Sequence, residues 1–132
     1  MSTNNINFPL KDDVTTNSYF GMTQITKDAL SSDLILLLTT QIGERLYMPE
    51  YGCNLLKYIF EPNDGLTADD VEAEIKRMVS LYIPALTIKK VTFNWNTDAD
   101  GAVIPETQLN VNIKFVYNEN AFSEGGSLDL QF

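Results

Sequence analysis

Three glutamates in a turn-rich part of the chain, Glu44, Glu50 and Glu61, are the residues that could support hydrolysis. A pair of carboxylates cleaves a glycosidic bond when one protonates the leaving oxygen and the other attacks the sugar or activates water. The two groups must face each other across a sugar-sized cleft, and the surrounding loop sequence is too short to build one. We interpret these acids as solvated or ion-paired, with Arg45 as one available partner.

Other side chains that support catalysis or metal binding are scarce. The chain contains no histidine, so it lacks the usual general base and the commonest transition-metal ligand. The single cysteine, Cys53, has no base or cationic cluster nearby and is predicted to be a packed residue. Asp98, Asp100 and Gly101 suggest a calcium loop, but the apolar residues that follow favour a hairpin turn. We predict no enzyme activity, no cofactor and no metal site.

Length and composition predict one soluble domain. A chain of 132 residues with 44% hydrophobic residues is sufficient for a single core. Its net charge of -9 repels phosphate backbones, so we expect no nucleic-acid partner. The longest apolar run, Leu34 to Leu38, is too short to cross a bilayer, and the N-terminus lacks a signal-peptide pattern. We expect no membrane partner, and synthesis in a reducing cytoplasm.

The first residues differ in pattern from the rest. Residues 1–21 carry isolated apolar positions among polar ones and are predicted to be an N-terminal arm, with a single domain over residues 22–132. The arm is either a frayed terminus or a segment whose Phe8 and Leu10 dock onto a neighbour.

A first helix is predicted from Thr26 to Ile42, with Gly43 as its C-terminal stop. Its apolar stripe is wide, so the helix is either buried on two sides, which we favour, or partly covered by a partner. Residues 44–53 have no helical period and are predicted to form a short strand and a loop. Asn54 then caps a short helical segment that extends to Phe60.

A second long helix is predicted to begin with Thr67 as N-cap and to end before Pro84. Glu72 and Lys76 form an outward pair four residues apart. The core face of this helix consists of Val71, Ile75, Met78, Val79 and Tyr82.

Beyond Pro84 the apolar period changes from helical spacing to alternation, which predicts three strands. The first, Leu86 to Asn96, needs a bulge near Lys89 and Lys90 to keep its apolar residues on one face. The second covers residues 109–117, and a terminal strand follows a flexible Gly125-Gly126 pair. The predicted fold is α+β, with N-terminal helices packed on a small open antiparallel sheet formed by the C-terminal half.

Three stretches in the middle of the chain share a motif pattern: Thr39 to Arg45, Met48 to Leu55, and Phe60 to Asp64. A helix that ends in a Gly-Glu-Arg turn, followed by a Pro-Glu-aromatic-Gly-Cys sequence, is a specific arrangement. It resembles the baseplate wedge, or sheath-initiator, family of contractile phage tails, which has relatives in type VI secretion baseplates. Relatives carry a Glu-Pro-Arg motif after the long helix, implied to contact the wedge core. Here Ile83-Pro84-Ala85 stands in its place.

The resemblance implies a structural subunit of the virion tail baseplate. Its partners would be the tail sheath protein and the wedge, inner-baseplate and tube proteins, with six copies or a multiple of six. It would template the first sheath ring by β-augmentation, in which a partner strand joins an open sheet edge. The alternatives are a peptidoglycan-degrading lysozyme-like enzyme and the equivalent subunit of a type VI secretion baseplate. The candidate partner-binding residues are Arg45, Glu50, Pro84, Leu128, Leu130 and Phe132.

Overall fold

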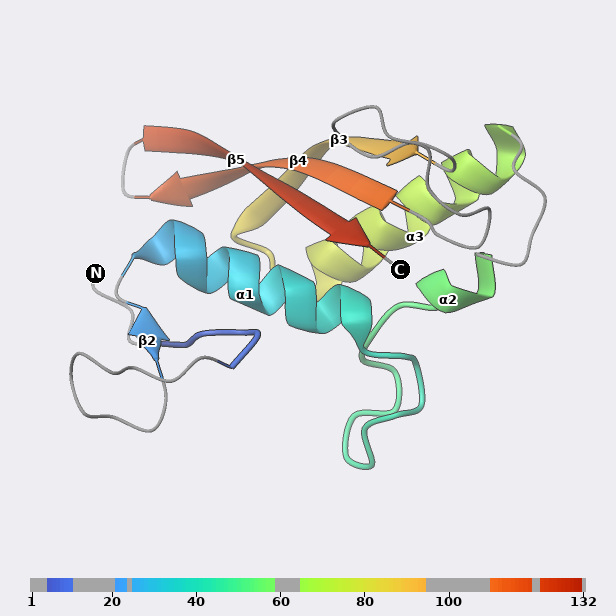
Figure 1. The fold of residues 1–132 in the computed structure, drawn as a ribbon, viewed down its shortest axis with the longest axis horizontal. Coiled ribbons are helices and arrows are strands. Elements are labelled where there is room, and N and C mark those ends of the chain that lie inside the picture. The colour runs from blue at the N-terminus through green and yellow to red at the C-terminus, as the bar shows by residue number, and fades with distance from the viewer. Residues whose placement is uncertain are drawn as a thin grey trace.

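Two long helices lie against one face of a three-stranded antiparallel sheet (Figure 1). The computed structural model describes residues 5–10, 21–23, 25–58, 65–94, 110–119 and 122–131. Their elements, in chain order, are β1 (Asn5–Ile6), β2 (Met22–Thr23), α1 (Thr26–Thr39), α2 (Leu55–Tyr58), α3 (Gly65–Tyr82), β3 (Leu86–Asn94), β4 (Asn110–Glu119) and β5 (Phe122–Gln131). The predicted α+β fold, with an open sheet from the C-terminal half, is confirmed.

Helix α1 ends at Thr39, three residues before the predicted end at Ile42. The hydroxyls of Thr39 and Thr40 donate to the backbone carbonyls of Ile35 (2.8 Å) and Leu36 (2.6 Å). These bonds satisfy carbonyls of the last turn, and the backbone of Thr40 is already extended. Gly43 therefore serves a later turn of the chain and does not stop the helix.

The predicted short strand within residues 44–53 is wrong, because this segment forms only turns and bends. It leaves α1, projects from the domain as a loop and returns to α2 (Figure 1). Helix α2 is described from Leu55 to Tyr58, and the rest of the predicted segment lies outside the described residues.

Helix α3 begins at Gly65, so Thr67 does not cap it. The Thr67 side chain is buried within the first turns of the helix, where packing extends the helix beyond the local capping signal. The predicted core face is confirmed, with Tyr82 half-buried and the other four residues buried. The Glu72–Lys76 pair is also confirmed, at 2.5 Å.

Strands β3 and β4 form the predicted hairpin pairing, with Leu86 opposite Tyr117 and Asn94 opposite Asn110. The bulge is confirmed by a shift of register between Ile88 and Lys90. It turns the apolar residues on both sides of it toward the helices. Trp95, the turn at residues 98–101 and residue Leu109 lie outside the described residues.

Strand β5 is longer than predicted, and the Gly125-Gly126 pair is part of it. Gly126 lies opposite Phe115 of β4, and a Cβ atom at this position would be 2.5 Å from the Phe115 ring. The missing side chain thus leaves space for the buried Phe115 ring to lie across β5. The glycines extend the sheet instead of forming a flexible entry to it.

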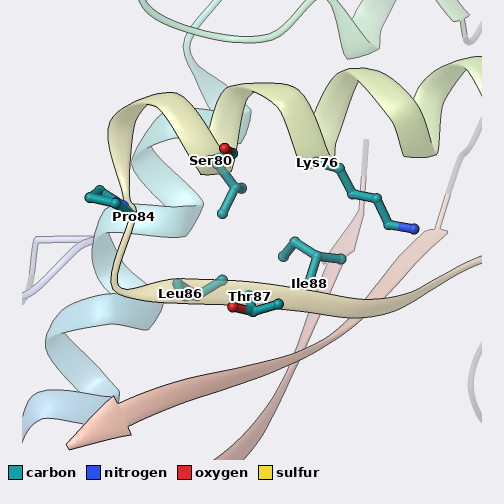
Figure 2. A pocket seen from close by; sticks show the side chains of 7 residues that line it. Lys76, Ser80, Pro84, Leu86, Thr87 and Ile88 are labelled. Carbon is teal, nitrogen blue, oxygen red and sulfur yellow. The ribbon is translucent and has the colours of Figure 1, made fainter.

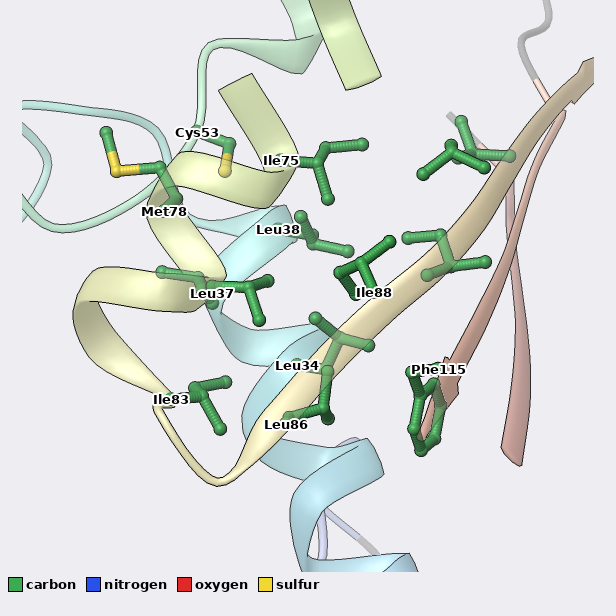
Figure 3. Close-up of a cluster of buried hydrophobic side chains, with 14 of the residues drawn as sticks. Leu34, Leu37, Leu38, Cys53, Ile75, Met78, Ile83, Leu86, Ile88 and Phe115 are labelled. Atoms are coloured by element: carbon green, nitrogen blue, oxygen red, sulfur yellow. The ribbon is translucent and has the colours of Figure 1, made fainter. Parts of the chain in front are cut away.

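One hydrophobic core joins the sheet to α1 and α3 (Figure 3). Leu34, Leu37 and Leu38 of α1 meet Ile75 and the other buried residues of α3 beneath the strands. Phe115 is among the largest fully buried side chains. Burial of each such side chain contributes roughly 1.5–3 kcal/mol.

The described part of the predicted arm folds back onto α1. Strand β1 pairs antiparallel with β2, and the Asn5 side-chain amide donates to Asp33 of α1 at 3.1 Å. On this side of the helix the half-buried Leu36 lines a pocket together with residues of β1, which agrees with the expected burial of α1 on two sides. The division into an arm over residues 1–21 and a domain over residues 22–132 stays a prediction.

Candidate assembly surfaces

Of the three glutamates that could support hydrolysis, the structure describes two, Glu44 and Glu50. The Glu44 carboxylate accepts a hydrogen bond from the backbone N–H of Gln41 at 3.0 Å, which closes a turn. Glu50 is exposed in the loop between α1 and α2, and Glu61 lies outside the described residues. Glu74, on α3, accepts hydrogen bonds from the Asn54 N–H and the Tyr58 hydroxyl. Glu44 and Glu74 therefore stabilise local structure through these hydrogen bonds.

Cys53 is buried in the core, as predicted. The pKa of the thiol is raised to about 12, mainly by burial. The nearby Glu74 carboxylate also raises this pKa, and the Arg77 guanidinium lowers it by a smaller amount. A thiol at neutral pH with this environment is neither a nucleophile nor a thiolate ligand.

The two edges of the sheet differ in regularity. Within the described residues the strand order is β3-β4-β5, so β3 and β5 are edge strands, and the outer edge of each is not paired with another strand. Strand β5 pairs with β4 without interruption from Asn110 opposite Gln131 to Glu119 opposite Phe122. Its ten residues form an edge about 33 Å long. An uninterrupted edge of this length can accept another strand along its backbone.

The β3 edge carries features that oppose strand addition. The bulge between Ile88 and Lys90 breaks its regular spacing, and both Lys89 and Lys90 are exposed. Lysines and bulges on an edge strand are common protections against edge-to-edge pairing. Lys90 also lies directly opposite the exposed Lys114 of β4, a like-charge pair that weakens the ladder.

The predicted partner residues of the last strand point inward. Leu128 and Leu130 are half-buried and pack against the core, opposite Ile113 and Val111. Phe132 lies outside the described residues. The outward positions of β5 carry Ser127, Asp129 and Gln131, all exposed. Any partner of this edge would therefore meet its backbone first.

Pro84 is exposed in the tight connection between α3 and β3. The backbone N–H of Leu86 donates to the Ile83 carbonyl at 3.1 Å and closes the turn. Pro84 lines a pocket of about 360 Å³ between the two elements (Figure 2). The other lining residues are Lys76, Val79, Ser80, Leu86, Thr87 and Ile88.

The loop of residues 41–52, which we call the projecting loop, contains the other two predicted partner residues. The Arg45 guanidinium lies 3.9 Å from the centroid of the Tyr51 ring. Tyr51 in turn packs edge-on against Tyr82 of α3, with ring centroids 4.9 Å apart. Arg45 is thus directed to the base of the loop, whereas Glu50 is exposed.

The predicted partner residues therefore fall on separate parts of the molecule: the projecting loop, the α3–β3 connection and β5. Sequence reasoning missed the tip of the projecting loop, where Leu46 and Tyr47 are 94% and 99% exposed. A possible signal was an apolar run bounded by charged residues and turn-forming Gly and Pro, with no period that would bury it.

The part of the chain that the structure describes has neither a membrane-spanning helix nor a cluster of metal-ligating side chains. No helix there combines the length and the apolar character needed to cross a membrane. No three His, Cys, Asp or Glu residues gather there in a way that would hold a metal ion.

Residues 25–120 match the protein family described as "Baseplate wedge protein gp25". A curated relative is the baseplate wedge protein gp25 of Enterobacteria phage T4, which is 38% identical over 58 residues. That alignment covers 44% of this chain and 44% of the T4 protein, so it spans less than half the length of that relative.

Two solved structures share the fold. A Geobacter sulfurreducens protein described as a tail lysozyme superposes with a TM-score of 0.62 and 20% identity, covering 80% of this chain and 90% of its own. A chain of the anti-feeding prophage baseplate superposes with a TM-score of 0.63 and 16% identity, covering 97% of this chain and 84% of its own. At these identities the likeness concerns the fold alone.

Proposed function

Because this chain belongs to the baseplate wedge protein gp25 family, a family of structural subunits of contractile-tail baseplates, we propose that it initiates the tail sheath. In this proposal it binds wedge proteins and inner-baseplate or tube proteins near the tail tube. It then templates the first sheath ring by accepting a strand of the sheath protein at the edge of its sheet.

The contrast between the two sheet edges carries the proposal. The β5 edge offers an unbroken row of backbone groups, whereas the β3 edge is interrupted by a bulge next to Lys89 and Lys90. Main-chain hydrogen bonds would supply the affinity, so the polar side chains of β5 are no obstacle. We therefore assign the incoming strand to β5, where it would lie beside α1, the helix that contacts this strand.

The α3–β3 connection is our candidate for the contact with wedge proteins. Only Pro84 of the relatives' Glu-Pro-Arg motif is present, so the motif's two charged groups are absent from these positions. The pocket beside Pro84 offers apolar walls and one cation, Lys76, which is already paired with Glu72. Arg77, exposed on the same helix, is our candidate to supply the missing charge.

We propose that the chain is not an enzyme, although a structural neighbour is described as a tail lysozyme. The Glu44 carboxylate is engaged in a turn, and Glu50 is exposed on the projecting loop. A turbidity assay on purified cell wall should show no clearing. Clearing that Glu50→Gln abolishes would establish the peptidoglycan hydrolase instead.

The strand-template proposal is tested by blocking the β5 edge without disturbing the domain. Removing residues 125–132 would be a poor test, because it would also uncover Phe115 and delete the packed Leu128 and Leu130. A single proline is cleaner, since it removes one backbone donor. Neighbouring amides of a strand point in opposite directions, so one of Ser127 and Leu128 directs its N–H away from β4. Amide hydrogen exchange on the isolated protein identifies that residue as the faster of the two.

Proline at this outward amide should leave the urea unfolding midpoint close to that of a variant with alanine at the same position, and it should leave the chain in the baseplate. Sheath polymerisation on such baseplates should fail. The matched control places proline at the outward amide of Thr92 or Phe93 in β3, where sheath assembly should continue. Normal sheath on the β5 variant would refute the assignment.

The assembly itself is proposed to be a virion tail, with the chain made in the host cytoplasm and present in six copies or a multiple of six. The equivalent subunit of a type VI secretion baseplate is the competing assignment. Mass spectrometry of purified particles decides between them, since the chain should co-purify with phage head and tail proteins.

A further inference from the structure

The tip of the projecting loop exposes apolar side chains that the domain does not use. Leu46 and Tyr47 are almost fully exposed, and Met48 is 46% exposed. They are adjacent in sequence and together form an apolar protrusion. Single exposed apolar residues are ordinary on protein surfaces, but three in succession at the end of a projection are typical of a binding site.

Hydrogen bonds within the projecting loop fix its shape. The Gly43 N–H donates to the Pro49 carbonyl at 2.7 Å, across the loop from one side to the other. At the stem, the Cys53 N–H donates to the Thr40 carbonyl at 2.9 Å. Gly43 and Gly52 have φ angles of 91° and 122°, which are conformations that favour glycine. The loop therefore holds a specific conformation in isolation.

The base of the loop is tied to the domain by aromatic contacts. Arg45 lies over the Tyr51 ring, and Tyr51 packs against Tyr82 of α3. The apolar tip is thus presented on a fixed support. Such pre-organisation reduces the conformational entropy that a partner must remove on binding.

Charge indicates the chemistry of the partner. The chain has a net charge of -9, so a second copy of itself would be repelled. The tip is flanked by the exposed acids Glu44 and Glu50, whereas Arg45 is drawn back onto Tyr51. The complementary surface would be an apolar pocket with basic groups at its rim.

We propose that Leu46, Tyr47 and Met48 insert into an apolar pocket with a basic rim on a neighbouring baseplate protein, and that this contact anchors the subunit in the baseplate. The inference rests on the proposed function, because it takes the neighbour to be a baseplate component. This contact uses a different surface from the β5 edge, and it forms before the sheath protein binds. Tyrosine is enriched among the residues that supply most of the binding energy at interfaces, and methionine is enriched at interfaces as well.

The test uses baseplates that assemble in cells lacking the sheath protein, so that sheath initiation cannot affect the result. The chain carries Leu46→Ser and Tyr47→Ser together, and its amount per baseplate is measured by quantitative mass spectrometry against another baseplate protein. We expect this amount to fall by about tenfold or more, the effect of losing central interface residues. The single variant Tyr47→Phe, which keeps the ring, should retain most of the wild-type occupancy.

The single variant Leu46→Ser should also lower the occupancy. Leu81→Ser is its matched control, because Leu81 is also a highly exposed leucine but lies on α3. Its occupancy should equal that of the wild type. Urea unfolding of all variants should be unchanged, since neither tip side chain packs in the domain. Wild-type occupancy of the double variant would overturn the inference while leaving the strand template intact. Absence of the wild-type chain from the baseplates would overturn the proposed function as well.

Discussion

Gly52 is the residue on which the shape of the projecting loop depends most directly. Its φ of 122° is unfavourable for other residues, and an added Cβ would collide with the Thr40 carbonyl oxygen. We expect Gly52→Ala to lower the free energy of unfolding by about 2–4 kcal/mol.

Gly43 provides the control for this prediction, because it also has a positive φ but has open space around its Cβ position. Gly43→Ala should cost only about 1 kcal/mol. Urea unfolding monitored by circular dichroism measures both. Equal losses for the two variants would show that the contact with Thr40 is unimportant.

Cys53 makes stability depend on pH in the alkaline range. Its folded-state pKa of about 12 exceeds the ordinary value of 9.0, because burial and Glu74 disfavour the thiolate. The neutral thiol therefore contributes stability below about pH 9, and this contribution is lost as the pH rises toward about 12. The difference in free energy of unfolding between wild type and Cys53→Ala should shrink from about pH 8.5 to about pH 11. A constant difference would contradict the raised pKa.

Residue identity alone could predict part of the site. The surroundings of Cys53 in the sequence predicted a packed residue, and the buried thiol agrees with that prediction. The exposure of Leu46 and Tyr47 could not be predicted, because apolar residues in a short aperiodic stretch are equally compatible with burial. The direction of the Leu46 and Tyr47 side chains depends on the backbone conformation of the projecting loop, which its hydrogen bonds fix.

At the scale of elements, β5 depends on the cross-strand pair of Phe115 and Gly126. Gly126→Ala should lower the free energy of unfolding by about 1–3 kcal/mol, because its Cβ would press on the buried ring. Gly125→Ala should cost little, since its nearest contact is a carbonyl oxygen at 4.0 Å. Combining Gly126→Ala with Phe115→Leu should give less than the sum of the single losses in urea unfolding. Strict additivity would exclude the proposed contact.

The bulged strand β3 carries a second testable pair. Lys90 lies directly opposite Lys114, so Lys90→Glu should replace repulsion by attraction and raise the free energy of unfolding by about 0.5 kcal/mol at low salt. The gain should diminish at high salt because the ions screen exposed charges. Adding Lys114→Glu should remove it by restoring a like-charge pair. A gain that survives in the double variant would point to a cause other than this pair.

Elements could be predicted where the apolar residues were strongly periodic, or where a break in that periodicity required a local irregularity. The alternation on both sides of Lys89 and Lys90 required a bulge, and the structure has one. The ends of α1 and α3 were not predictable, because threonine hydroxyls and tertiary packing outweighed the Gly43 and Thr67 signals. The length of β5 was missed because Gly125 and Gly126 have low intrinsic strand preference, and only their pairing with β4 reveals their role.

At the scale of the whole molecule, the fold separates three surfaces that an assembly subunit could use at different steps. The projecting loop, the Pro84 connection and the β5 edge belong to different elements around one core. The order α1, α2, α3, β3, β4 and β5 could be predicted from the sequence, whereas β1 and β2 were not expected and the strand predicted within residues 44–53 is absent from the structure. The sequence could not predict that β3 and β5 are the edge strands, because this depends on the strand order, in which β4 pairs with both neighbours.

The most direct test of the account is a reconstruction of the assembled tail at a resolution that traces the backbone. We predict that a strand of the first sheath ring is hydrogen-bonded along the outer edge of β5, and that β3 has no added strand. A sheath strand on β3, or a first sheath ring attached while both edges stay unpaired, would contradict the central claim.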